Sequence, residues 1–302
     1  MTLDDRRILL VHAHPDDESI SNGASMARYV AEGAQVTLVT CTAGEEGEIL
    51  IPEIEHLASD QDDALGPHRV KELEEAMALL GVTDHRFLGG EFHFRDSGMQ
   101  WGSDGHAAAL DESREGTFWH ADLTQASNLL VEIIREVRPH VLVTYDEFGG
   151  YGHPDHIQAH RVATYGAVLA SIATYRRDLG EPWDIPKVYW TAMSASAMRE
   201  GLRTLREAGD TTTFEGMDPD NLPPFAVEDD DLDAMIDGSD FLEVKLDAMR
   251  AHASQIATDG PFFAFSNNVG NRVWGVEFYR LVKGTPAPPE GAGFEDDLFA
   301  GL

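Results

Sequence analysis

The chain has 302 residues, a single cysteine and a formal net charge of −32 at pH 7. Such an acidic surface repels nucleic-acid phosphates, one cysteine excludes an internal disulfide, and no apolar run is long enough to predict a transmembrane helix. The start of the chain also lacks the layout of a signal peptide. We therefore expect a cytoplasmic protein without nucleic-acid or membrane partners, whose acidity reflects high solubility or adaptation to a salty cytoplasm. The sequence does not indicate the oligomeric state.

The apolar pattern predicts strands and helices in alternation along most of the chain. Strands are expected at 8–11, 36–41, 86–88, 141–145, 188–191, 232–236 and 276–282. Helices are expected from a cap at 21–22 to about residue 32, and at 68–80, 123–137, 157–173, 194–207 and 241–252. Residues 90–120 show no periodicity, 209–240 read as a polar surface excursion, and the acidic tail from 284 is expected to be ordered in part at best.

The first strand, helix and second strand form a βαβ unit, and such crossovers make parallel sheets. We therefore expect an α/β fold with a mostly parallel sheet. The chain contains no clear domain linker, which favours a single domain over residues 1–302. Within it, 1–175 are expected to form the sheet core, and 176–302 a smaller, irregular C-terminal part that packs on this core.

Two polar clusters follow predicted strands. His12-Ala-His-Pro-Asp-Asp-Glu18 comes directly after the strand at 8–11, and Tyr151-Gly-His-Pro-Asp-His156 follows the strand at 141–145. Ligands of parallel α/β sheets bind at the carboxyl ends of the strands. We therefore expect both clusters to meet at one edge of the sheet.

The residue types in these clusters predict a catalytic metal site. His14 and Asp17 lie three residues apart on a turn, and His156 can supply a third ligand from the second cluster. Two histidines and one carboxylate, with positions left for water, are typical of a catalytic Zn²⁺ site, where the bound water has its pKa lowered to about 7. Asp16 is then placed to act as general base toward that water.

The second cluster offers helpers for the reaction. His153 could protonate a leaving amine or hold an oxyanion, and Tyr151 could polarise a carbonyl. Asp155 could orient His153, as carboxylates commonly do for catalytic imidazoles. His12 is expected to support the metal ligands from behind. His160 is not predicted as a ligand, because a histidine in such a position more often packs or forms a local hydrogen bond.

An alternative chemistry uses the same ligands. A triad of two histidines and one carboxylate can also hold Fe(II) for oxygenase chemistry, and Fe²⁺ could occupy this triad in the cell. The oxygenase reading leaves Asp16 and His153 without a role. A single His-x-x-Asp motif is weak evidence for a metal, and the pairing of two clusters is what makes the prediction.

These motifs resemble the zinc-dependent family of N-acetylglucosaminyl-phosphatidylinositol de-N-acetylases and their bacterial relatives, and the resemblance runs over about residues 8–282. The matching segments are Val11-His-Ala-His-Pro-Asp-Asp-Glu-Ser19, Thr40-Cys-Thr-Ala-Gly-Glu-Glu-Gly-Glu48, Phe94-Arg-Asp-Ser-Gly-Met99 and Gly149-Gly-Tyr-Gly-His-Pro-Asp-His156. Within the family they look most like the branch that deacetylates N-acetylglucosaminyl-inositol in mycothiol biosynthesis.

The resemblance implies a Rossmann-like sheet with helices on both faces and a less regular C-terminal part. It implies one Zn²⁺ per chain on His14, Asp17 and His156, with Asp16 as base. It implies Tyr151, His153 and Asp155 as helpers in the transition state, and Arg69 and Asp96 as sugar contacts. From the residues alone, Arg69 would more often be a solvated charge, and Asp96 lies in the irregular 90–120 segment.

Two other functions stay open at this point. The sister activity of mycothiol S-conjugate amidase shares the zinc motif, although Gly152 and the 94–99 segment look more like the deacetylase. A non-catalytic sugar-binding module on the same fold would have little use for Asp16 beside three metal ligands.

Overall fold

A mostly parallel sheet runs through the computed structural model, which describes residues 5–102, 106–112, 114–260, 263 and 275–302. Within these residues the sheet has eight strands in the order β3-β2-β1-β6-β7-β10-β9, with β8 paired to β7. The strands are β1 (Arg7–His12), β2 (Gln35–Thr40), β3 (Asp84–Phe87), β6 (Val141–Thr144), β7 (Lys187–Ser194), β8 (Ala226–Val227), β9 (Ala234–Asp237) and β10 (Val276–Lys283). Pairing is parallel from β3 through β7, and β10 is antiparallel to both β7 and β9.

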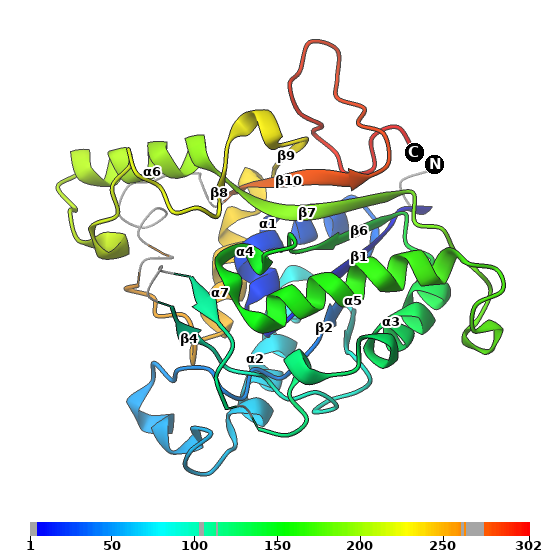
Figure 1. Ribbon diagram of the computed structural model, residues 1–302. Helices are drawn as coiled ribbons and strands as arrows, with labels where there is room; N and C mark the ends of the chain where they lie inside the picture. The colour runs from blue at the N-terminus through cyan, green and yellow to red at the C-terminus, as the bar shows by residue number, and fades with distance from the viewer. Residues whose placement is uncertain (1–4, 103–105, 113, 261–262, 264–274) are drawn as a thin grey trace.

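Helices cover both faces of this sheet (Figure 1). The principal helices are α1 (Asp17–Ala31), α2 (Leu65–Leu80), α3 (Leu123–Val137), α5 (Pro154–Ser171), α6 (Ala195–Glu207) and α7 (Leu242–Ala251). Helices α1, α2 and α7 pack together on one face, and α3 packs against α5 on the other, while α6 lies at the end of β7. The expected α/β architecture is therefore confirmed. No helix in the described ranges is long and apolar enough to span a membrane.

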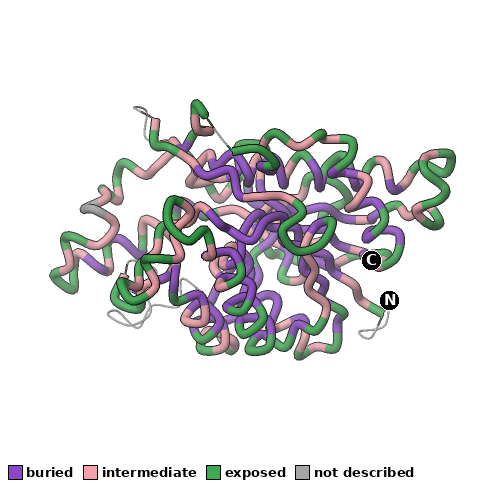
Figure 2. Tube along the Cα trace, turned by 90° about the horizontal axis from the view of Figure 1, so that it is seen from below, coloured by how far each residue is buried: buried purple, intermediate pink, exposed green. Residues whose placement is uncertain are grey.

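The alternation of side chains along β1 explains why both faces need a helical layer. Ile8 and Leu10 belong to the buried cluster under α1 and α2, whereas Leu9 and Val11 belong to the cluster under α3 and α5. Side chains of a strand point alternately to opposite faces, so an unbroken apolar run buries both. Figure 2 shows the result, with buried chain through the middle of the molecule and exposed chain around it.

Three helices begin earlier than the sequence predicted. Helix α1 begins at Asp17 rather than after the 21–22 cap, α2 begins at Leu65 rather than at 68, and α5 begins at Pro154 rather than near 157. In α1 and α5 the first turn consists of motif residues, and it has the acidic side chains or proline that suit a helix N-terminus. By contrast, α3 has the expected bounds.

The C-terminal tail is not loosely ordered, which corrects the expectation from its composition. Glu295 is fully buried beside Lys187 and Tyr189, and Leu298 and Phe299 join the apolar cluster under α1. A backbone bridge also pairs Glu295 with the start of β9. These few anchors hold a segment that is otherwise rich in glycine, proline and acidic residues.

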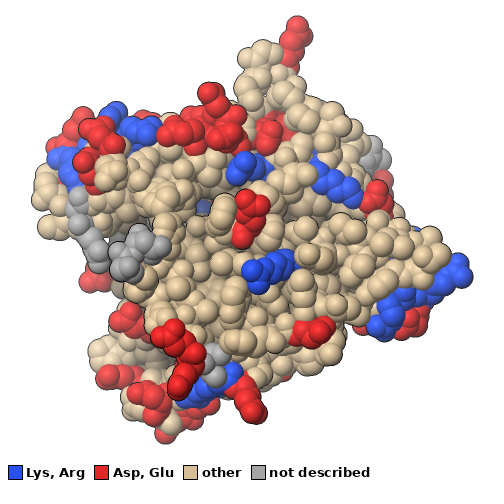
Figure 3. Space-filling model, viewed as in Figure 1, with Lys and Arg blue, Asp and Glu red and all other residues tan. Residues whose placement is uncertain are grey.

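Acidic side chains on the face seen in Figure 3 gather over the α6 and β8–β9 region and over the loop between β2 and α2. The middle of that face carries few charges. Among the described residues of the 90–120 segment the backbone is irregular as expected, apart from a small ladder of β4 (Gln100–Trp101) with β5 (Ala107–Ala108) and a short turn at Phe118–His120.

Candidate metal centre

The two polar clusters meet where the sheet order changes direction. Strand β1 lies between β2 and β6, so the chain leaves β1 toward one edge of the sheet and later returns to its other side at β6. Such a switch point opens a crevice at the carboxyl ends of the two strands. The segment 12–18 leaves the end of β1 and the segment 149–156 follows β6, so the structure brings them together as expected.

His14 and Asp17 lie side by side in the first turn after β1. His14 Nδ1 is 3.4 Å from Asp17 Oδ2, and the backbone N–H of His14 donates to the same oxygen over 3.0 Å. Tyr145, the residue after β6, donates its hydroxyl hydrogen to Asp17 Oδ2 over 2.8 Å. Burial alone would raise the pKa of Asp17, but His156 and His14 hold it well below the usual range. The carboxylate is therefore ionised and held in one orientation.

His156 is oriented with one nitrogen turned toward this carboxylate. Its Nδ1 lies 3.2 Å from the carbonyl oxygen of Gly149 and so must carry a hydrogen, which in the neutral ring leaves the lone pair on Nε2. Nε2 is buried, has no hydrogen-bond partner among the described residues, and is 3.4 Å from Asp17 Oδ1. A buried, unpartnered lone pair facing a carboxylate fits a metal ligand, because such histidines commonly bond a backbone carbonyl through their other nitrogen.

Gly149 permits this close approach. Its φ is +65°, and a Cβ at this position would lie 2.7 Å from His156 Cβ and 2.8 Å from the Ile157 nitrogen. A larger residue would therefore have to push the segment that carries His156 away from residue 149.

Two groups of three described residues could each hold a metal ion by the spacing of their ligand atoms. One consists of His14, His153 and His156, and the other of His14, Asp96 and Asp155. The triad expected from the sequence has two short contacts, from Asp17 to His14 and from Asp17 to His156. His14 and His156 are thus common to the expected triad and the first group, and a metal held by both would take either Asp17 or His153 as its third ligand.

Asp16 is a half-buried residue with a strained backbone beside the expected ligands. Its backbone has φ +114° and ψ −34°, a region that costs a residue with a side chain on the order of 1–3 kcal/mol. Arg69 Nη2 lies 3.1 Å from Asp16 Oδ2, and Glu18 accepts a hydrogen bond from the Asp16 backbone N–H. Burial raises the pKa of Asp16 to about 6 although Arg69 pulls it down, so this carboxylate can gain and lose a proton near neutral pH.

Arg69 is not the solvated charge that its position on a helix usually implies. Only 3% of the residue is exposed, and its guanidinium donates to the carbonyl oxygens of Gly44 and Pro15 as well as to Asp16. It therefore ties the loops after β1 and β2 together. Its Nε is buried and has no hydrogen-bond partner among the described residues.

Asp96 and Asp155 both lie against His14. His14 Nε2 is 3.3 Å from Asp155 Oδ2 and 3.5 Å from Asp96 Oδ1. Ser97 donates to both Asp155 oxygens, through its backbone N–H and its hydroxyl. The Asp155 carboxylate thus faces His14 rather than His153, which differs from the expectation. His153 instead accepts the backbone N–H of Asp155 on its Nδ1 over 3.1 Å.

Their ionisation follows from this packing. Burial raises the pKa of Asp155, whereas His14 overcomes the burial of Asp96 and holds the pKa of Asp96 below its usual range. For His14, as for Asp96, the neighbouring charges outweigh burial. Burial disfavours its charged form, but Asp96, Asp155 and Asp17 raise its pKa well above the usual value.

His153 and Tyr151 complete the wall formed by the second cluster. The His153 ring packs 4.6 Å from that of His14, and the Tyr151 ring lies 5.1 Å from that of His156. Burial, together with His14 and His156, holds the pKa of His153 well below its usual value, so this imidazole is neutral. Burial likewise raises the pKa of Tyr151, which keeps its hydroxyl protonated and able to donate.

Four residues that contact the candidate site were not predicted for it from the sequence: Glu18, Ser97, Tyr145 and His252. Glu18 bonds the Asp16 backbone and lies 2.9 Å from His252 Nε2 across the fold. Tyr145 touches His12 as well as Asp17, and it could have been noticed as the polar end of a predicted strand. His12 has both nitrogens on protein partners, which fits support rather than ligation.

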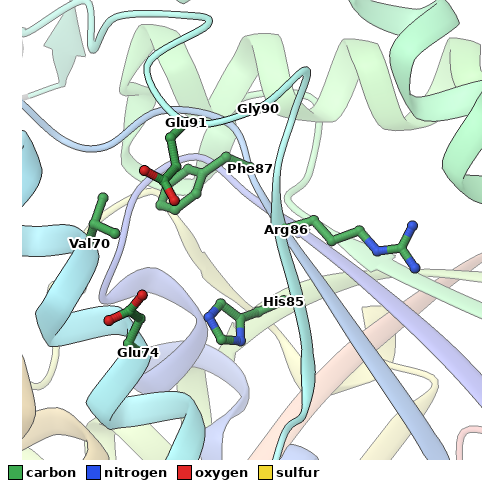
Figure 4. A pocket seen from close by; sticks show the side chains of 7 residues that line it. All are labelled: Val70, Glu74, His85, Arg86, Phe87, Gly90 and Glu91. Carbon is green, nitrogen blue, oxygen red and sulfur yellow. The ribbon is translucent and has the colours of Figure 1, made fainter.

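One surface pocket lies apart from these residues, between α2 and β3 (Figure 4). The carboxylate of Glu74 and the ring of His85 point toward each other in it. It is lined by Val70, Glu74, His85, Arg86, Phe87, Gly90 and Glu91, and no residue predicted for the site is among them.

Comparison with known proteins points to one family. A family model described as GlcNAc-PI de-N-acetylase matches residues 9–166. A 1D-myo-inositol 2-acetamido-2-deoxy-alpha-D-glucopyranoside deacetylase from a Nocardioides species is 67% identical over 299 residues, covering 99% of each chain. The protein of the same name from Kribbella flavida is 65% identical over 301 residues, again covering 99% of each chain.

Solved structures share the fold at low sequence identity. The N,N'-diacetylchitobiose deacetylase from Pyrococcus horikoshii superposes with a TM-score of 0.60 at 19% identity, over 94% of this chain and 86% of its own. The 4-carboxy-2-hydroxymuconate hydratase from Pseudomonas putida superposes with a TM-score of 0.58 at 16% identity, over 94% and 99%. One fold thus serves deacetylases and a hydratase, so the reaction must be argued from the site.

Proposed function

We infer the function of this chain from the premise that it belongs to the GlcNAc-PI de-N-acetylase family. The chain is an N-deacetylase, and its substrate is 1D-myo-inositol 2-acetamido-2-deoxy-alpha-D-glucopyranoside, the compound named for relatives that are 67% and 65% identical over nearly its full length. Hydrolysis of the acetamide releases acetate and the free amino sugar, a step that we assign to mycothiol biosynthesis. The observation that carries this inference is the meeting of His14, Asp17 and His156 beside a half-buried Asp16.

We propose that His14, Asp17 and His156 hold one Zn²⁺, with Fe²⁺ as the other metal that this ligand set accepts. The unpartnered Nε2 of His156 and the fixed Asp17 carboxylate support this set. Zn²⁺ bound there would supply a Lewis acid and lower the pKa of a bound water. Asp155 and Asp96 would then position His14 through its Nε2, as carboxylates do for metal-binding histidines.

Asp16 is proposed as the general base. Its raised pKa lets it take a proton from water at neutral pH and return it to the leaving amine or to solvent. Arg69 keeps a positive charge 3.1 Å from this carboxylate, which prevents the pKa from rising further. Arg69 thus acts on the base, and any contact with the sugar comes in addition.

His153 and Tyr151 are proposed to act on the acetamide oxygen and nitrogen. Neutral His153 can donate a hydrogen bond from Nε2, since its Nδ1 already accepts the Asp155 N–H. The Tyr151 hydroxyl, whose pKa is raised by burial, donates without ionising and so can stabilise developing negative charge on the oxygen.

Acetate release from the inositol glycoside by the zinc-loaded protein tests this function. We expect turnover in the wild type and a loss of about 10²-fold or more in Asp16→Ala, because a positioned base contributes 10²–10⁴-fold. Wild-type turnover in that variant would refute the assignment of the base. Rates measured side by side with a mycothiol S-conjugate separate the deacetylase from the amidase, and faster cleavage of the conjugate would overturn the substrate proposed here.

A further inference from the structure

Trp101 is an exposed aromatic side chain at the rim of the site. It lies on β4 and 64% of the residue is exposed. Single exposed apolar residues are common on protein surfaces and need no function by themselves. Trp101 differs from such residues because the segment before it and the strand paired with it both contact the two polar clusters.

The ladder of β4 and β5 that carries Trp101 is attached to the site at two points. Five residues before it, Asp96 lies 3.5 Å from His14, and Ser97 bonds the Asp155 carboxylate. On its partner strand, Ala107 pairs with Trp101 and packs against Gly152, where a Cβ would lie 2.7 Å from the Ala107 carbonyl oxygen. The position of the Trp101 backbone relative to Tyr151 and His153 is therefore fixed from both sides.

A series of rings leads from the metal centre outward to Trp101. The Tyr151 ring lies 5.1 Å from that of His156, and the Trp101 ring lies 6.1 Å from that of Tyr151, with an angle of 35° between their planes. Steps of this length are those between stacked or neighbouring rings. A two-ring substrate that extends outward from His156 along these rings would have its first ring beside Tyr151 and its second beside Trp101.

We propose that Trp101 binds the second ring of the substrate, the polyhydroxylated cyclohexane joined to the amino sugar, through the apolar C–H face of that ring. The indole face combines a large apolar area with partial negative charge, which suits the C–H bonds of a saturated ring that carries no charge of its own. This inference rests on the proposed function for the identity of the substrate. It assigns to Trp101 a role in specificity for two-ring over one-ring acetamido sugars.

Steady-state kinetics with two substrates test the inference. With the inositol glycoside, we expect Trp101→Ala to raise KM about fivefold to tenfold and to leave kcat within about twofold, with a smaller rise in Trp101→Phe. With methyl N-acetylglucosaminide, which has one ring, the same variants should keep the wild-type KM. Tyr165→Ala is the matched control, because Tyr165 is an exposed aromatic residue on α5.

A binding measurement separates failure of this inference from failure of the proposed function. Calorimetric titration with the deacetylated products, glucosaminyl-inositol and methyl glucosaminide, needs no turnover. A selective loss of glucosaminyl-inositol affinity in Trp101→Ala supports the role of Trp101, even if acetate release were absent and the function wrong. Equal affinity of wild type and variant for glucosaminyl-inositol, or an equal loss for both products, would overturn it.

Discussion

Removing the Tyr145 hydroxyl should weaken metal binding without removing a ligand. This hydroxyl donates to Asp17 Oδ2 over 2.8 Å, accepts the Ala13 N–H over 2.9 Å, and lies 3.1 Å from His12 Nδ1. In Tyr145→Phe the buried Ala13 N–H loses this partner and Asp17 loses one of the two donors to Oδ2. Losses of this kind cost about 1–3 kcal/mol each, so we expect the free energy of unfolding of the metal-free protein to fall by about 2–6 kcal/mol.

Tyr145→Phe should weaken metal binding because Asp17 is then held less firmly in one orientation. Groups that orient a ligand typically contribute 10–100-fold to metal affinity, and we expect a loss in that range for Tyr145→Phe. Competition with a chromophoric chelator measures the zinc dissociation constant, and urea denaturation measures stability. Tyr175→Phe is the control, because it also removes one hydroxyl that donates to a side chain, Asn128. Unchanged zinc affinity in Tyr145→Phe would refute the idea that this hydroxyl holds Asp17 for the metal.

Two further predictions concern stability. Buried Arg135 donates to six carbonyl oxygens around the end of α5. Because a buried acceptor that loses its donor costs about 1–3 kcal/mol, Arg135→Met should lower the free energy of unfolding in urea by about 3–5 kcal/mol, and a loss below about 1 kcal/mol would contradict this. Burial disfavours the charged form of His252, but the neighbouring Glu18 raises the pKa of this histidine above its usual value of about 6.5. The charged histidine therefore stabilises the fold fully below pH 6.5, and this stabilisation is lost as the pH rises through the raised pKa. His252→Gln should therefore flatten the fall in stability above pH 6.5, and an unchanged slope would count against this pair.

The parallel half of the sheet could be predicted because its strands are short, apolar and followed by polar clusters. Strand β1 and helix α3 are examples in which local pattern and final structure agree. The start of α1 was missed because the capping rule favoured Ser21 and Asn22, whereas the metal motif itself turns into helix at Asp17. In the fold, Asp17 contacts Tyr145 and His156, and such contacts between distant segments lie outside the local capping rule.

Contacts between segments far apart in the chain could not be predicted from the sequence. The Asp155 carboxylate faces His14 because Ser97, 58 residues earlier, bonds both of its oxygens. The tail is ordered because Glu295 reaches Lys187 and Tyr189 in the sheet. Neither pairing leaves a trace in periodicity or composition, since each depends on how the whole sheet is assembled.

The metal content of two variants tests most directly which residues form the site. Asp17→Asn and His153→Gln differ in which third ligand they remove, while His14 and His156 stay in place. Zinc measured by atomic emission after identical purification should be lost from Asp17→Asn and stay near one per chain in His153→Gln, whose acetate release should nevertheless fall. Zinc retained in Asp17→Asn and lost from His153→Gln would show that three histidines hold the metal, and would contradict the site proposed here.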